Sequence, residues 1–220
     1  MQRLKIAFVA SGGAARGLAH LGVLKACEEL GVVPEVFVGT SAGAIVGAMY
    51  GQDIPLDVLL DGYRLPWRRR HRGPRLRVRS FTGAPTLSDI FDPGYLLSGL
   101  FSMNKFERYL RRFLPINDFA RLSKPVFITA VNVDSGERHV FGPGYDTTSR
   151  VSEAVAASCC VPGLFRPIRI RGNYFVDGEV ARTLSADIAV EAGADVVIIS
   201  NIYRPVQQLE PSRSIARQGI

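Results

Sequence analysis

The chain has 220 residues, with 27 Lys and Arg against 20 Asp and Glu, and a formal net charge of +7. Hydrophobic residues make up 47% and charged residues 21%, which is ordinary for a globular domain and far too apolar for a disordered chain. Eight arginines lie within residues 64–79, which hold no carboxylate, and without these eight charges the rest of the chain carries −1. The positive charge is therefore local, which disfavours a protein that binds nucleic acid over its whole surface.

The cysteines and the apolar runs indicate the cellular compartment in which we expect the protein. The chain has three cysteines, and two of them, Cys159 and Cys160, are adjacent, which fits neither a disulfide framework nor a metal site. We therefore expect no metal and no cofactor. The apolar N-terminal run leads directly into glycines, as in a first strand and unlike a signal peptide. The longest uncharged stretch, residues 36–52, is shorter than the roughly 20 apolar residues of a membrane span. We expect a cytoplasmic protein, with peripheral membrane association as a further expectation.

The first 50 residues alternate apolar runs, glycine-rich turns and helical spacing. They predict a strand over residues 4–10, a glycine loop, a helix over 18–27 that stops at Gly31, a strand over 36–38, and a sharp turn into a helix over 44–50. This alternation favours a parallel sheet covered by helices.

The rest of the chain continues in the same style. We predict helices over 57–63, 104–113, 152–159 and 186–192, with Asn104 as an N-cap, and strands over 126–133, 138–141, 168–170, 174–176 and 196–200. Asp134-Ser135-Gly136 predicts a turn that pairs the second of these strands back as a hairpin. We expect one domain over 1–204, with a basic insertion at about 64–99 and a polar C-terminal tail at 205–220.

The pentapeptide Gly39-Thr40-Ser41-Ala42-Gly43 fits the G-x-S-x-G nucleophile elbow. In that motif the serine occupies a strained strand-to-helix turn, and the flanking glycines, here Gly39 and Gly43, allow the backbone to pass closely. The position between an apolar strand and an apolar helix agrees with the motif. The alternative is a tight turn with an incidental serine.

A second glycine-rich loop, Gly12 to Gly17, follows the first predicted strand. Leu18 stands where a phosphate-binding Walker A loop needs lysine, and the glycine spacing differs from the dinucleotide fingerprint. The exposed N–H groups of such a loop suit an oxyanion hole. The alternative is a turn that needs glycine only to bend.

A carboxylate is the simplest partner for Ser41. A triad of the α/β-hydrolase type needs a histidine after its acid, and His20, His71 and His139 all precede Asp177. Asp177 follows a predicted strand and precedes Gly178, a setting that would hold its carboxylate rigidly and let it act directly on the serine. The alternative for Asp177-Gly178 is an ordinary turn.

Together these segments resemble the patatin-like phospholipase family, in the expected order over roughly residues 5–201. The similar segments are residues 11–24, 39–43, 154–165 and 177–178. The resemblance implies a three-layer α/β/α sandwich with a mostly parallel central sheet, and hydrolysis of acyl esters of lipids through an acyl-enzyme intermediate. It further implies these roles: Ser41 as nucleophile, Asp177 as general base, Gly12, Gly13, Ala14 and Ala42 as oxyanion-hole donors, and Arg16 and Gly17 as support of the loop.

Three places differ from the family pattern, and one of them is the segment of residues 180–185, where an Asn-Asn or Pro-like sequence is common. Ala14 stands where a third consecutive glycine is usual, and alanine would be strained there if the position needs a positive φ. Glu179 stands where glycine or alanine is usual, and a carboxylate beside Asp177 would raise its pKa or compete for a proton. These differences motivate an alternative: a catalytically weak member of the family that binds lipid or protein.

The arginine segment has its own interpretation. Clustered arginines attract anionic bilayers at about 1 kcal/mol each, and Trp67 is suited to the membrane interface. We expect an anionic membrane surface as a partner of Trp67, Arg68, Arg69, Arg70 and Arg72, with a lipid or acyl ester as the substrate. Nucleic-acid binding through residues 64–79 is the less favoured alternative, because only Trp67 could stack on a base there.

Overall fold

The computed structural model describes residues 4–64 and 101–203. Their strands form one seven-stranded sheet. Parallel pairing joins four strands in the order β7 (Val196–Ser200), β1 (Ile6–Ala10), β2 (Val36–Thr40) and β3 (Val126–Asn132). The antiparallel pairs add β4 (Arg138–Phe141) and β6 (Asn173–Asp177) to β3, and β5 (Ile168–Ile170) to β6. The predicted hairpin of β3 and β4 is confirmed.

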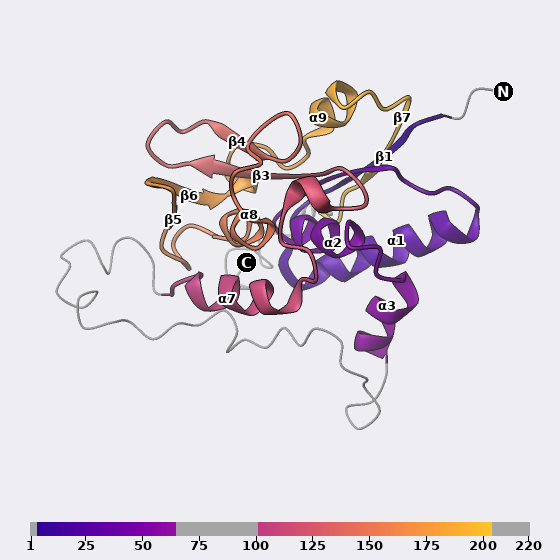
Figure 1. Ribbon diagram of the computed structural model, residues 1–220, viewed down its shortest axis with the longest axis horizontal. Coiled ribbons are helices and arrows are strands. Elements are labelled where there is room, and N and C mark those ends of the chain that lie inside the picture. Colours follow the sequence, from indigo (N-terminus) through magenta and orange to yellow (C-terminus); the bar gives the residue numbers. More distant parts are fainter. Residues whose placement is uncertain (1–3, 65–100, 204–220) are drawn as a thin grey trace, which may run out of the picture.

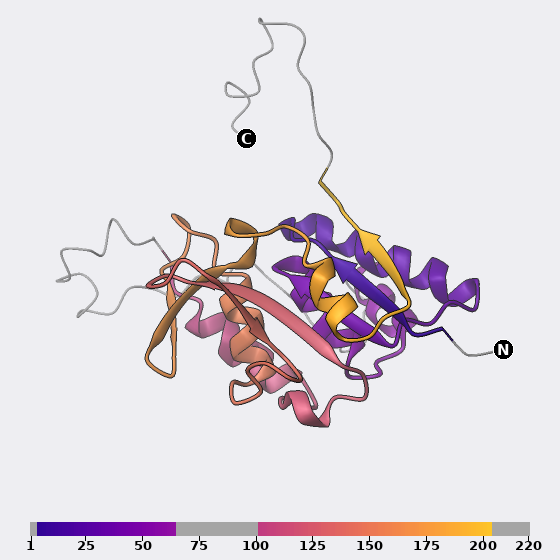
Figure 2. The same cartoon turned by 90° about the horizontal axis from the view of Figure 1, so that it is seen from above.

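Helices cover both faces of this sheet (Figure 1). One face carries α9 (Ala186–Glu191), and Figure 2 views the molecule from that side. The opposite face carries α1 (Leu18–Glu29), α2 (Ala42–Tyr50), α3 (Leu56–Arg64), α7 (Asn104–Phe113) and α8 (Val151–Ser158). Short 3-10 helices form at η1 (Ala14–Gly17), η2 (Phe119–Arg121) and η3 (Gly178–Val180). The three-layer α/β/α architecture implied by the resemblance is confirmed.

Alternate residues of each central strand enter different cores. In β1, Phe8 and Ala10 belong to the large core under α1, α2, α7 and α8. Ala7 and Val9 belong to the smaller core with Ile188 of α9. Both faces of the strand are therefore buried, and for this reason the strand is a continuous apolar run in the sequence.

Strand β3 is long enough to pair with two strands in succession. Thr40 of β2 is paired with Thr129, and Asp177 of β6 is paired with the next residue, Ala130. β4 pairs with the same part of β3, so β2 and β6 lie end to end along its other edge. Because β2 runs parallel and β6 antiparallel to β3, their C-terminal ends face each other. This arrangement brings residue 41 towards residue 177.

A few boundaries differ from the sequence predictions. Asn104 is the first residue of α7 rather than its cap, and the N-cap is Met103, without a side-chain hydrogen bond. β6 extends through Asp177, one residue beyond the apolar run. Among the described residues, no helix has both the length and the apolar character to cross a bilayer. The predicted basic insertion and C-terminal tail fall almost wholly outside the described residues.

Candidate active site

Ser41 occupies the turn between β2 and α2. Its backbone has φ 52° and ψ −115°, a region that costs a non-glycine residue of order 1–3 kcal/mol. Ser41 is 7% exposed. A strained serine at a strand-to-helix turn has the backbone geometry of the nucleophile elbow.

The glycines of the elbow are required by close backbone contacts. A Cβ atom on Gly39 would lie 2.5 Å from the carbonyl carbon of Gly43, and one on Gly43 would lie 2.5 Å from the Ala10 carbonyl oxygen. A Cβ atom on Gly17 would lie 2.5 Å from Cβ of Ala42. The elbow is thus pressed against β1 and the glycine loop, where no side chain fits.

The C-terminal end of α8 holds the strained turn in place. The Ser41 N–H donates to Oγ of the buried Ser158 over 2.7 Å, and Sγ of Cys159 donates to the Ser41 carbonyl over 3.3 Å. Burial raises the pKa of the Cys159 thiol well above its usual value, so this group remains a neutral donor. Neither Ser158 nor Cys159 was predicted as a site residue from the sequence. The signal available was a serine at the end of a helix whose last turn is otherwise formed by small apolar residues, Ala154 to Ala157.

Asp177 lies at the end of β6, with its carboxylate turned inward. The residue is 3% exposed, its N–H donates to the Cys160 carbonyl over 2.9 Å, and its Oδ1 accepts from the Glu179 N–H over 3.0 Å. Gly178 is required because a Cβ atom there would lie 2.5 Å from the Thr129 carbonyl oxygen. The Asp-Gly pair is therefore fitted against β3 rather than placed in a free surface turn.

The environment of Asp177 raises the pKa of its carboxyl. Burial raises the pKa of the Asp177 carboxyl, while hydrogen bonds from the Glu179 backbone and the Ser41 side chain act in the opposite direction. The serine is thus close enough to influence the carboxylate. A buried carboxyl with a raised pKa beside a serine hydroxyl is suited to general-base chemistry.

The glycine loop has two consecutive residues with positive φ. Gly13 has φ 133° and Ala14 has φ 51°, so the alanine occupies the strained conformation for which glycine is usual. The Arg16 N–H donates to the Gly13 carbonyl over 3.1 Å, and Arg16 as a residue is exposed. The backbone of Arg16 therefore supports the loop.

A buried histidine joins the loop to the elbow. His20 is fully buried, with Nε2 2.9 Å from the Ser11 carbonyl oxygen and Nδ1 2.7 Å from Oγ of Ser200. Because a carbonyl only accepts, Nε2 donates. Burial lowers the pKa of His20, which favours a neutral ring whose Nδ1 accepts from the Ser200 hydroxyl. The same Ser11 carbonyl accepts from the Gly43 N–H over 3.2 Å, so His20 is a positioning residue that sequence analysis did not find.

Glu179 meets the loop directly. Its Oε1 accepts a hydrogen bond from the Gly12 N–H over 2.6 Å. Burial raises the pKa of the Glu179 carboxyl, the Gly12 hydrogen bond lowers it, and the charge of Asp177 raises it further. Proximity of Glu179 to Asp177 was expected from the sequence, but the contact with Gly12 was not.

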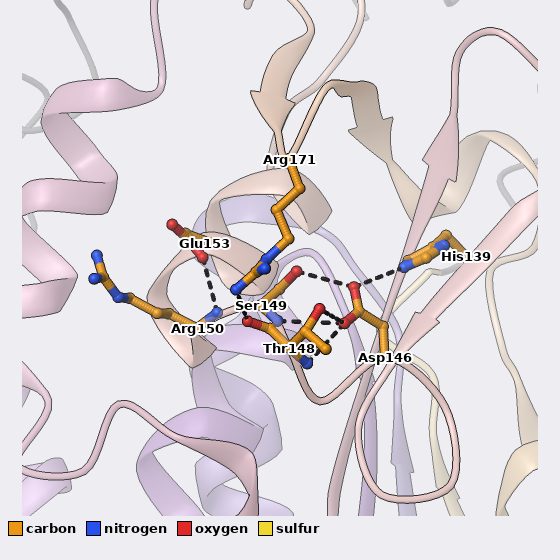
Figure 3. Close-up of polar contacts among 7 residues, drawn as sticks. All are labelled: His139, Asp146, Thr148, Ser149, Arg150, Glu153 and Arg171. Atoms are coloured by element: carbon orange, nitrogen blue, oxygen red, sulfur yellow. Dashed lines mark hydrogen bonds and ion pairs between the residues drawn. The ribbon is translucent and has the colours of Figure 1, made fainter.

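A polar cluster anchors the other end of α8 (Figure 3). Asp146 accepts hydrogen bonds from the backbone N–H and the hydroxyl of both Thr148 and Ser149, and lies 3.2 Å from Nε2 of His139. Burial alone would raise the pKa of Asp146, but these hydrogen bonds lower it to about 2. The Arg150 N–H donates to Glu153 in a capping arrangement. The helix that holds Ser41 is therefore fixed at both ends.

Some predicted site residues cannot be placed. Trp67, Arg68, Arg69, Arg70 and Arg72 lie outside the described residues. Within residues 4–64 and 101–203, no three or more His, Cys, Asp and Glu side chains are grouped to hold a metal ion.

The relatives found by comparison with known proteins include patatin-like phospholipase domain proteins and lysophospholipases. The chain is 30% identical over 199 residues to patatin-like phospholipase domain-containing protein 6 of Homo sapiens, and 27% identical over 197 residues to lysophospholipase nte1 of Aspergillus fumigatus. Each match covers 90% of this chain, but only 13% and 12% of the respective relative. The crystal structure of VipD from Legionella pneumophila aligns with a TM-score of 0.49 and 17% identity, over 80% of this chain and 46% of VipD.

The family profile described as patatin-like phospholipase matches residues 8–190. This span includes both glycine-rich turns and Asp177, and covers more than half of the chain. The resemblance seen in the sequence is confirmed: the chain belongs to the patatin-like phospholipase family.

Proposed function

We propose that the protein is a serine esterase of the phospholipase A type, which hydrolyses acyl ester bonds of lipids through a Ser41–Asp177 dyad. The observation that carries the proposal is the end-to-end meeting of β2 and β6 on β3. It brings a strained serine and a buried carboxylate of raised pKa to one point. Family membership and relatives named phospholipase and lysophospholipase support the lipid ester as substrate.

The proposed reaction has two steps. Asp177 accepts the Ser41 proton as Oγ bonds to the ester carbonyl carbon, and the carbonyl oxygen becomes an oxyanion. Backbone N–H groups of Gly12, Gly13, Ala14 and Ala42 stabilise that oxyanion. The C–O bond to the alcohol or lysolipid breaks, and the leaving oxygen takes the proton from Asp177. Water then attacks the acyl-serine, with Asp177 again as base, and releases the fatty acid and free Ser41.

Hydrolysis of p-nitrophenyl acyl esters tests this mechanism. Wild type is compared with Ser41→Ala and Asp177→Asn, and we expect the rate to fall at least 10³-fold in the serine variant, in line with the order of about 10³–10⁶ seen when a catalytic nucleophile is removed. Labelling by a fluorophosphonate probe, with the labelled residue found by mass spectrometry, identifies the nucleophile. Unchanged hydrolysis by Ser41→Ala would refute the dyad.

One observation favours a second candidate function. The Glu179 carboxylate already holds the Gly12 N–H, as expected for a weakly catalytic member of the family that binds lipid or protein. This candidate predicts no fluorophosphonate labelling of Ser41 together with retained binding of lipid vesicles.

The arginine run supports a separate proposal about location. Trp67, Arg68, Arg69, Arg70 and Arg72 are proposed to bring the protein to anionic bilayers as a peripheral partner. Co-sedimentation with vesicles should increase with their content of anionic lipid, and should decrease when Arg68, Arg69 and Arg70 are replaced by glutamine. Binding that responds to neither change would contradict the proposal.

A further inference from the structure

Glu179 places a carboxylate on one of the proposed oxyanion-hole donors. The 2.6 Å distance from Oε1 to the Gly12 nitrogen is shorter than the usual N–H···O distance and is typical of a charge-assisted bond. The residue follows Asp177 by two positions and lies in the first turn of η3. A carboxyl oxygen of Glu179 therefore occupies one of the donors to which the proposed reaction would bring a negative oxygen.

The side chain also packs against the loop backbone. A Cβ atom on Gly12 would lie 2.7 Å from Cγ and 2.9 Å from Cδ of Glu179. A side chain at position 12 would therefore meet the Glu179 side chain, which would have to shift to make room for it. While Glu179 is in place, a second oxygen could share the Gly12 proton only in a weaker, bifurcated bond.

A displaced Glu179 carboxylate has other partners at hand. The side chains of Thr183 and Tyr203 both form hydrogen bonds that lower the pKa of Glu179. Tyr203 is 44% exposed, and Glu179 itself is only partly buried. Movement away from Gly12 therefore does not leave the charge buried and without a partner.

We propose that Glu179 is an internal competitor for the oxyanion hole, which the substrate carbonyl oxygen must displace from the Gly12 N–H before Ser41 attacks. The inference rests on the proposed function and deepens it. Because the competition takes place in the free enzyme, it lowers kcat/KM by one common factor for every ester and for every serine-directed phosphonate. A residue that shaped the acyl pocket would change these rates by factors that depend on the acyl chain.

The test compares Glu179→Ala and Glu179→Gln with wild type. Glu137→Ala is the matched control, because it removes the same charge from an exposed position. In Glu179→Ala we expect kcat/KM for p-nitrophenyl butyrate and laurate, and the rate of Ser41 phosphonylation, to rise by the same factor of ~10, as a charge-assisted hydrogen bond implies. Glu179→Gln keeps a weaker acceptor at this position, so its kcat/KM and its phosphonylation rate should rise by a smaller factor. Butyrate, a carboxylate product, should inhibit Glu179→Ala at lower concentration than wild type.

A second readout does not depend on activity. The Gly12 amide proton should resonate downfield in the wild-type NMR spectrum and move upfield in Glu179→Ala. Circular dichroism measures whether the variants are folded. If Glu179→Ala is not folded, the comparison is made between Glu179→Gln and wild type. Rates that stay equal to the control or fall in folded variants, or an unmoved Gly12 resonance, would overturn the inference. Absence of Ser41 labelling in every variant would instead overturn the proposed function, and this inference with it.

Discussion

Ala14 and Ala15 provide a paired test of the backbone of the glycine loop. Both are exposed, but Ala14 has φ 51° whereas the φ of Ala15 is not positive. A left-handed backbone costs alanine about 1–2 kcal/mol, and the greater freedom of glycine in the unfolded chain offsets about 0.4–1 kcal/mol of that gain. Ala14→Gly should therefore raise the free energy of unfolding by about 0.5–1 kcal/mol. Ala15→Gly should lower it by about 0.5–1 kcal/mol.

Equilibrium denaturation in urea, followed by circular dichroism, measures the two changes. The same chemical substitution at adjacent exposed positions should move the transition midpoint in opposite directions, with unchanged slope. The two variants should differ by about 1–2 kcal/mol. Equal destabilisation by both substitutions would refute the assignment of a strained backbone at Ala14.

Three further predictions concern the site. Ser158→Ala removes the acceptor of the buried Ser41 N–H and should lower the free energy of unfolding by about 1–3 kcal/mol in urea denaturation; a change below the experimental error would mean that water replaces the hydroxyl. Because burial raises the pKa of Asp177, its protonated form favours the folded state, and the wild-type free energy of unfolding should fall as pH rises through the folded pKa. Asp177→Asn should therefore be the more stable protein at neutral pH by thermal denaturation, although we expect it to be inactive, and a lower Tm than wild type would contradict this. Gly178→Ala places a Cβ atom 2.5 Å from the Thr129 carbonyl oxygen and should lower Tm by several degrees, and an unchanged Tm would show that β6 can shift at no cost.

The parallel part of the fold was predictable because β1 and β2 are buried on both faces, and the edge strand β7 is also a continuous apolar run although it is only partly buried. Residues 36–40 and 196–200 are short apolar runs next to glycine or polar turns, and tertiary contacts did not override these local signals. The elbow and the loop were predictable for a related reason, since Gly39, Gly43 and Gly17 each face backbone or a small side chain at 2.5 Å. Such steric requirements leave a trace in the local sequence.

Contacts between distant segments left no such trace. Nothing near residue 179 indicates that its carboxylate reaches Gly12, and nothing near His20 indicates that it bridges Ser11 and Ser200. These contacts depend on where β1, β6 and β7 end relative to one another. That relation is set by the register of the whole sheet, which no local pattern specifies.

The order of the strands along β3 also has a consequence for biosynthesis. Translation produces β2 with Ser41 first, then β3, and β6 with Asp177 much later. The nascent chain therefore presents the serine turn while the edge of β3 that receives β6 is still open. The proposed nucleophile has no carboxylate partner until β6 has docked, so the proposed dyad is assembled only when the sheet is nearly complete. A polypeptide released early, before residue 173, would carry Ser41 without Asp177 and would lack the base of the proposed dyad.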